Sequence, residues 1–106
     1  MATARPTRVV NIRREMHNVY VGRAGHGYDG YFGNPFHPVG DGEDARITCI
    51  EQFRDYFHRR MRDDVEYARR ILELRGKKLG CFCKPKVCHA DIIAEYLNNL
   101  DGNDAK

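Results

Sequence analysis

The residues best suited to chemistry in this 106-residue chain are gathered in one short segment near its C-terminus. Residues 80–91, called here the Cys-His segment, read Gly-Cys-Phe-Cys-Lys-Pro-Lys-Val-Cys-His-Ala-Asp. They contain three of the four cysteines of the chain, together with one histidine and one aspartate. A hydrophobic core does not require this combination of thiols, imidazole, carboxylate and lysines. We therefore expect any binding or reaction by the protein to be centred on this segment.

One interpretation of the Cys-His segment is a reactive thiol. Cys88 comes where the last predicted helix begins, and the N–H groups of a helix N-terminus favour a thiolate. Lys84 and Lys86 add positive potential to the same place. His89 is then the general base or partner, and Asp91 either orients His89 or caps the helix. This interpretation makes Cys88, His89 and Asp91 the candidate catalytic residues.

Three other interpretations of the same residues stay open. Zinc prefers sulfur and nitrogen ligands, and the segment offers the set Cys81, Cys83, Cys88 and His89. However, the spacing C-x-C-x4-C-H departs from the common C-x2-C pattern, and adjacent residues rarely both face one ion. In a third interpretation, the helix N-terminus with Lys84 and Lys86 holds an anion. In the fourth, the cysteines only fill space and the aspartate only caps the helix.

A second segment with functional potential is rich in glycine. Residues 22–38, called here the Gly-rich segment, contain five glycines in seventeen positions, which predicts a long loop. Arg23 is suited to bind a phosphate or a carboxylate, and the amide of Asn34 can read a base edge or a ribose. The alternative for Asn34 is ordinary turn chemistry. The dinucleotide-binding pattern G-x-G-x-x-G followed by a helix is absent.

The spacing of apolar residues predicts the elements that hold these two segments. Short β-branched runs predict strands over 9–12 and 18–21, close enough for an antiparallel hairpin, and a third strand covers 78–83. Three-and-four spacing predicts a helix that begins near residue 43, a second one that ends near 74, and a last one over 89–100. The buried stripe of the first helix is Ile47, Ile50, Phe53, Phe57 and Met61. In the second helix, Val65 and Ile71 are expected to face inward.

This order of elements predicts an α/β fold, in which a small sheet of about three strands is covered by about three helices. A single domain spans residues 8–100, and residues 1–7 and 101–106 are flexible termini. If the second and third strands are parallel neighbours, the Gly-rich and Cys-His segments follow them at the same sheet edge. The two segments then line one cavity.

Composition and charge restrict the class of protein. Hydrophobic residues make up 42% and charged residues 31%, which is typical of a folded soluble domain. No apolar run approaches the ~20 residues that cross a bilayer, and the N-terminus lacks the apolar region of a signal peptide. We therefore expect a cytoplasmic protein with reduced cysteines and no membrane partner. The net charge is only +3, and acids are interleaved with the arginines of residues 54–70, which is typical of a salt-bridged helical face.

Several blocks of the chain together resemble a family of small domains of unknown function from bacteriophages and bacteria. The blocks are residues 9–13, 19–23, 33–36, 74–83, 85 and 88–91. They carry a Gly-Asn-Pro-Phe motif and a Cys-x-Cys-x-Pro-x-x-Cys-His-x-Asp motif, and the chain differs in a longer glycine-rich stretch at 26–30. The resemblance implies no settled activity. A phage origin would place the protein in the host cytoplasm, in nucleotide handling or in interference with host proteins.

These observations lead to one function hypothesis and two alternatives. In the leading hypothesis, the cavity between the two segments binds a nucleotide-like or other anionic small molecule, with Arg23, Asn34, Cys83 and Lys84 as ligand-binding residues. Whether Cys88 and His89 then carry out a reaction is left open. The first alternative is a zinc-stabilised protein that binds a host protein. The second is a nucleic-acid-binding module, which the interleaved acids disfavour.

Overall fold

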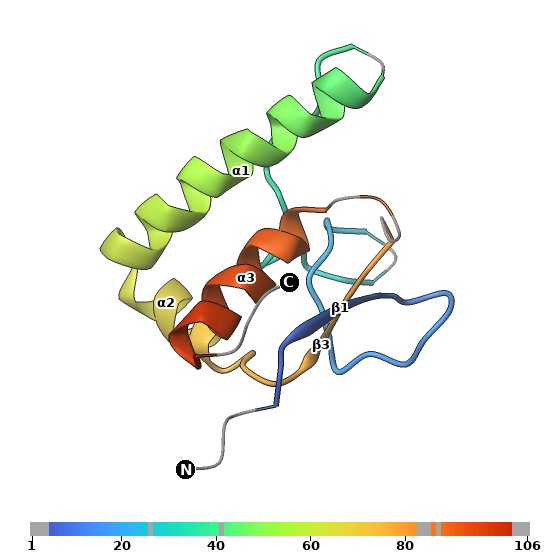
Figure 1. The fold of residues 1–106 in the computed structure, drawn as a ribbon. Coiled ribbons are helices and arrows are strands. Elements are labelled where there is room, and N and C mark those ends of the chain that lie inside the picture. Colours follow the sequence, from blue (N-terminus) through green and yellow to red (C-terminus); the bar gives the residue numbers. More distant parts are fainter. Residues whose placement is uncertain (1–4, 26, 41, 83–85, 87, 103–106) are drawn as a thin grey trace.

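The computed structural model of the protein describes residues 5–25, 27–40, 42–82, 86 and 88–102. Its elements, in chain order, are β1 (Arg8–Asn11), β2 (Val19–Tyr20), α1 (Glu43–Asp63), α2 (Val65–Leu72), β3 (Lys78–Cys81) and α3 (His89–Leu100). In Figure 1, α3 lies over the small sheet, and the long α1 runs obliquely beside α3 and projects beyond it at its N-terminal end. The described part of the chain has three strands and three helices, so the predicted α/β class is confirmed.

The strands form a parallel sheet with β3 in the middle, in the order β1-β3-β2. Leu79 of β3 is opposite Val9 of β1 on one side and opposite Val19 of β2 on the other. The predicted antiparallel hairpin between the first two strands is therefore wrong, because β3 separates them and both run in its direction.

A glycine in the middle strand explains how such a short connection can join β1 and β2. Parallel strands usually need a crossover of about a dozen residues or more, whereas here residues 12–18 make the return. A Cβ atom at Gly80 would come within 2.5 Å of Ile12 Cγ2 and 2.7 Å of His17 Cδ2. The connection thus passes back across the face of β3 in the space that a side chain at Gly80 would fill.

The core lies between the sheet and the helices, and its large buried members are Phe53, Phe57, Tyr67, Ile71, Leu79, Ile93 and Leu97. The predicted stripe of the first helix is confirmed at Ile50, Phe53 and Phe57. Ile47 of the same stripe, in the N-terminal part of α1, is 45% exposed. No helix in the described residues is both long and apolar enough to cross a membrane.

The start of α2 differs from the predicted position. Asp64 is the N-cap, since its Oδ1 accepts the N–H of Tyr67 at 3.1 Å. Val65 is then the first helical residue and is 84% exposed, so its predicted inward position is wrong, whereas Ile71 is buried as expected. The N–H of Tyr67 and the guanidinium of Arg60 hold the pKa of the Asp64 carboxyl below its usual value.

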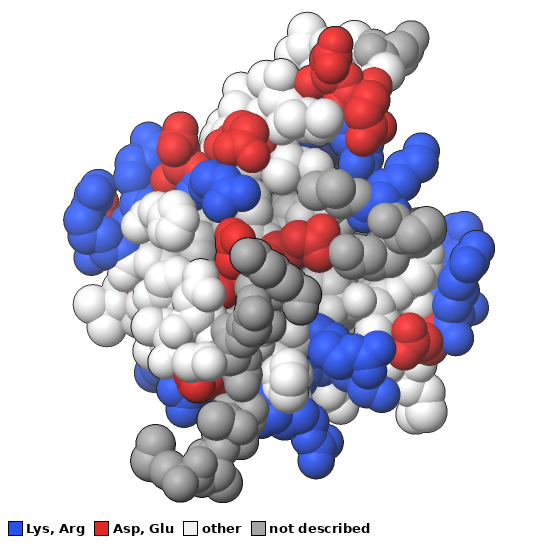
Figure 2. Space-filling model, in the orientation of Figure 1, with Lys and Arg blue, Asp and Glu red and all other residues white. Residues whose placement is uncertain are grey.

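The arginine-rich surface of α1 and α2 carries ion pairs. Arg60 pairs with Asp64, and Arg69 and Arg70 both pair with Glu66. Figure 2 shows blue and red side chains next to one another over this part of the molecule. The predicted salt-bridged face is confirmed for these residues. Their acids neutralise the positive charge of the arginines, which would otherwise attract a phosphate backbone.

A buried pair of hydrogen bonds joins the two ends of the domain. Asn98 Oδ1 accepts the N–H of Thr7 at 2.8 Å, and Asn98 Nδ2 donates to the carbonyl of Thr7 at 2.9 Å. The Thr7 hydroxyl accepts the N–H of Gly76 at 2.9 Å. Thr7 is 3% exposed, so the ordered domain includes a residue ahead of the predicted boundary at position 8. Residues 1–4 and 103–106 of the predicted flexible termini lie outside the described residues.

We expect Asn98→Ala to lower the free energy of unfolding by about 2–4 kcal/mol, because the buried N–H and carbonyl of Thr7 would lose their partner. Asn99→Ala is the matched control, since Asn99 is exposed on the same helix, and it should change stability by less than about 0.5 kcal/mol. Urea unfolding followed by circular dichroism measures both. Equal stability of the two variants would contradict a structural role for the Asn98 amide.

Candidate functional site

A cavity of about 450 Å³ lies at the sheet edge where β2 and β3 end. The Gly-rich segment follows β2 and the Cys-His segment follows β3, and since these strands are parallel neighbours, both segments border the cavity. Its lining includes Gly22, Arg23 and Asn34 from the first segment and Cys81, Phe82, Cys88 and His89 from the second. The start of α1 completes the wall with Gly40, Gly42 and Arg46.

Cys88 and His89 are in contact, although they are neighbours in sequence. Cys88 is the N-cap of α3, and its Sγ lies 3.6 Å from Nδ1 of His89. Nε2 of His89 lies 2.6 Å from the carbonyl oxygen of Val21. Because a carbonyl only accepts hydrogen bonds, Nε2 carries a proton, and in the tautomer with this single proton Nδ1 faces the thiol as an acceptor. The arrangement can move a proton from Cys88 to His89.

A second thiol lies on the other side of Cys88. Cys81, the last residue of β3, places its Sγ 3.2 Å from the Sγ of Cys88. Both cysteines are 1% exposed and both line the cavity. The ring of His89 packs edge-on against Phe53 with the ring centroids 5.1 Å apart, which fixes its orientation. The cavity floor therefore carries two sulfur atoms and one oriented imidazole.

Asp91 caps the start of α3, which is one of the two roles predicted for it. Its Oδ2 accepts the backbone N–H of Cys88 at 3.0 Å, and Cys88 Sγ accepts the N–H of Ala90 at 3.5 Å. The Cys88 side chain also accepts from the backbone of Asp91, and this contact forms a capping box with the bond from the Cys88 N–H to the Asp91 carboxylate. The N–H groups of Cys88 and Ala90 are thus already used within the chain, so they do not serve an outside anion.

Arg23 and Asn34 tie the Gly-rich segment to α1. The guanidinium of Arg23 donates to the backbone carbonyl of Asn34 and lies 3.8 Å from the Sγ of Cys49. Asn34 Nδ2 donates to the carbonyl of Cys49 at 3.2 Å, and its Oδ1 accepts the N–H of Phe36 at 2.9 Å. Asn34 is buried, and its amide makes the turn contacts that were the alternative to ligand binding.

The structure adds cavity residues that the sequence did not indicate, among them Arg46 and Tyr20. Arg46 lies in the first turns of α1 and places a second guanidinium at the cavity. Tyr20 stacks on Tyr28 with a centroid distance of 3.9 Å and lies 6.0 Å from the ring of Phe82. Phe82, the aromatic residue between two cysteines, was the available sequence signal for the aromatic part of the lining. Arg46 had no such signal, because nothing in the helical pattern distinguishes it from the other arginines of α1.

Two predicted ligand-binding residues, Cys83 and Lys84, lie outside the described residues. The predicted metal set Cys81, Cys83, Cys88 and His89 therefore stays a prediction. Within the part of the chain that the structure describes, no group of three or more histidine, cysteine, aspartate or glutamate residues is arranged to hold a metal ion.

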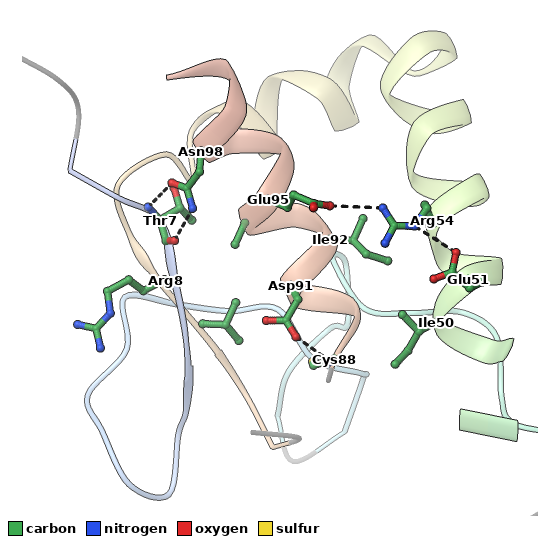
Figure 3. A pocket seen from close by; sticks show the side chains of 12 residues that line it. Thr7, Arg8, Ile50, Glu51, Arg54, Cys88, Asp91, Ile92, Glu95 and Asn98 are labelled. Carbon is green, nitrogen blue, oxygen red and sulfur yellow. Dashed lines mark hydrogen bonds and ion pairs between the residues drawn. The ribbon is translucent and has the colours of Figure 1, made fainter. Parts of the chain in front are cut away.

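A second cavity, of about 480 Å³, lies between β1, α1 and α3, and Figure 3 shows it from close by. Cys88 and Ile50 line both cavities, so they form part of the wall between them. In the second cavity Arg54 pairs with Glu51 at 3.2 Å and with Glu95 at 3.4 Å. Its charged groups thus largely neutralise one another, whereas the described lining of the first cavity contains the two arginines Arg23 and Arg46 and no acid.

We expect Cys88 to react with iodoacetamide at neutral pH faster than Cys49, because His89 can accept the thiol proton of Cys88. His89→Gln keeps a donor for the Val21 carbonyl but removes the basic nitrogen, so it should slow the alkylation of Cys88 by about tenfold or more. Cys49 lines the same cavity and should react at the same rate in both proteins. Mass spectrometry of timed samples measures each rate, and an unchanged Cys88 rate in the variant would contradict the proton transfer.

Comparison with known proteins is consistent with the predicted resemblance. Residues 5–99 match the family model described as Domain of unknown function (DUF4326). The chain is also 42% identical over 66 residues to an uncharacterized 12.4 kDa protein in the nrdA-td intergenic region of Enterobacteria phage T4, a match that covers 62% of this chain and spans 61% of that relative. No solved structure matches the chain. The chain therefore belongs to the family Domain of unknown function (DUF4326).

Proposed function

We propose that the protein binds a nucleotide-like, anionic small molecule in the cavity between the Gly-rich and Cys-His segments. The observation that carries this proposal is that the cavity has two guanidinium groups, from Arg23 and Arg46, and two aromatic rings, from Tyr20 and Phe82. Its volume of about 450 Å³ is within the range of small-molecule sites. Guanidinium groups suit phosphates and aromatic faces suit bases.

In this proposal, the part of the cavity lined by the start of α1 binds the anionic group of the ligand. Gly42 is the N-cap of α1 without a side-chain cap, and Gly40 and Gly42 line the cavity. The positive end of a helix attracts anions, and the absence of side chains at both glycines lets a ligand come close to the backbone. Arg46 lies 3.8 Å from Glu43, whose side chain is 60% exposed, so an anionic ligand would replace Glu43 as the counter-charge.

The aromatic side of the cavity is the base-binding side. Tyr28 holds Tyr20 by stacking, and the Tyr20 hydroxyl donates to the carbonyl of Arg23 at 2.9 Å. Phe82 is 40% exposed, which leaves ring surface for a flat ligand. Cys83 and Lys84 follow Phe82 directly in sequence and remain proposed ligand-binding residues.

Asn34 has a positioning role in this proposal. Its amide and the Arg23 guanidinium hold the Gly-rich segment against α1, so the two guanidinium groups stay on one wall. Any reaction of the bound molecule would use Cys88 as nucleophile and His89 as base at the cavity floor, with Asp91 fixing the start of α3. The phage relative supports a role in the host cytoplasm.

We expect nucleotides to raise the melting temperature of the protein more than the matching nucleosides or sugar phosphates, because only nucleotides use both walls. Arg46→Gln should then weaken nucleotide binding by about ten- to a hundredfold, as loss of a charged hydrogen bond does. Arg54→Gln is the matched control, since Arg54 is an ion-paired arginine of the same helix that does not line this cavity. Thermal shift across a ligand panel, followed by calorimetry, measures both effects.

Two results would reject this function. The first is that no nucleotide, nucleoside or sugar phosphate raises the melting temperature. The second is that Arg46→Gln and Arg54→Gln weaken binding equally, since the cavity would then not hold the phosphate. Stoichiometric zinc that is needed for folding would instead support the zinc-stabilised interaction protein.

A further inference from the structure

The Sγ atoms of Cys81 and Cys88 lie next to each other in the cavity lining, and the proposed ligand binding does not account for this contact. We propose that Cys81 and Cys88 form a redox centre, in which the dithiol closes to a disulfide when a peroxide enters the cavity. The Sγ atoms are 3.2 Å apart, compared with about 2.05 Å in a disulfide bond. This inference goes beyond the proposed ligand binding and does not depend on it.

Secondary structure holds both cysteines in place. Cys81 is paired with Asn11 of β1, and its carbonyl accepts the N–H of Ile12 at 3.1 Å. Cys88 is held by the capping box with Asp91. The two sulfurs therefore meet because β3 and α3 are fixed relative to each other, and only the remaining gap between sulfurs 3.2 Å apart has to close for the bond to form.

Their surroundings give the two thiols different roles. Cys88 is the attacking thiol, because Nδ1 of His89 lies 3.6 Å from its sulfur and the N–H of Ala90 points at the same sulfur from 3.5 Å. An imidazole that accepts the proton and a helix N-terminus both favour the thiolate. Cys81, which is buried against Cys88, is the resolving thiol.

The reaction balances with a peroxide as the only oxidant. The Cys88 thiolate attacks one oxygen of hydrogen peroxide, the O–O bond breaks, and the leaving hydroxide takes the proton held by His89 to form water. Cys88 is then a sulfenic acid. The sulfur of Cys81 attacks the sulfur of Cys88, the S–O bond breaks, and the hydroxyl group leaves with the proton of Cys81 as a second water. Two thiols and one peroxide thus give one disulfide and two waters.

The cavity gives a small oxidant access to thiols that are otherwise buried, since both line it. Closing the disulfide also removes the reactive sulfur of Cys88 from His89, so the oxidised protein has no nucleophile at the cavity floor. Cys49 lines the same cavity, but its sulfur contacts the carbonyl of Phe36 at 3.2 Å and the amide of Asn34 at 3.5 Å. It is therefore a matched control for a buried thiol in the same cavity.

The test uses the full chain, reduced, treated with a chelator and desalted, and then exposed to one equivalent of hydrogen peroxide. We expect the intact mass to fall by two hydrogens and to recover with dithiothreitol. Trypsin cleaves after Lys86, and the Lys84-Pro85 bond resists it, so the disulfide will link the peptide 79–86 to the peptide 87–106. Cys49→Ser and Cys83→Ser should both retain this link, and the second variant shows that Cys81 is the partner in the peptide 79–86.

The variants also define the results that would overturn the proposal. In Cys81→Ser the link should be lost and a dimedone adduct should trap Cys88 as sulfenic acid. Loss of the link in Cys83→Ser, or peroxide that gives only sulfenic or sulfinic acid on Cys88 of the unmodified protein, would overturn the proposal. So would zinc that survives the chelator and protects both thiols, since they would then be metal ligands. Cys88→Ser, which keeps a good N-cap, serves as the folded control that cannot react.

Discussion

The pairing of β3 with a parallel strand on each side is the arrangement on which the rest of the molecule depends. It brings the ends of β2 and β3 to one sheet edge, and it therefore decides where the Gly-rich and Cys-His segments lie. Gly80 makes the arrangement possible, because the connection from β1 to β2 crosses β3 where this residue has no side chain. A larger residue there would push Ile12 and His17 away from the sheet.

The hydrogen bond from His89 to the Val21 carbonyl joins the end of β2 to the start of α3. It has two effects at once. It links two elements that are far apart in sequence, and it fixes which ring nitrogen faces Cys88. Structural and chemical roles are therefore combined in the same imidazole, so any variant of His89 has to be judged by both folding and thiol reactivity.

Much of the fold follows from local sequence signals. The structure differs from the prediction where contacts between distant parts of the chain determine its path. The last helix and the position of Cys88 at its start agree with the structure, since capping and apolar spacing are local properties. The hairpin was wrong because a short connection normally means antiparallel strands, and only the space above Gly80 permits the other path. Val65 is exposed because it is the first residue of α2, directly after the N-cap, and lies on a different side of the helix from the buried Ile71.

In the candidate site, too, some residues can be found from local patterns, whereas others depend on contacts between distant segments. Local patterns indicated the cysteines, His89 and Arg23. Because β2 and β3 are parallel neighbours, these residues line one cavity, as expected. Arg46 could not be found in this way, since its role depends on the start of α1 meeting the Gly-rich segment. The amide of Asn34 contacts Cys49 and Phe36, as in the predicted turn alternative, and Asn34 also lines the cavity, so its role toward a ligand stays a prediction.

The bond between Thr7 and Asn98 has a consequence for how this domain can be joined to others. It lies at the edge where the strands begin, while the cavity lies at the edge where β2 and β3 end. Thr7 and Asn98 are thus joined at the edge opposite to the one where the cavity lies. A second domain that packed against the Thr7–Asn98 edge would therefore leave the cavity uncovered, so this domain could be combined with others without loss of its cavity.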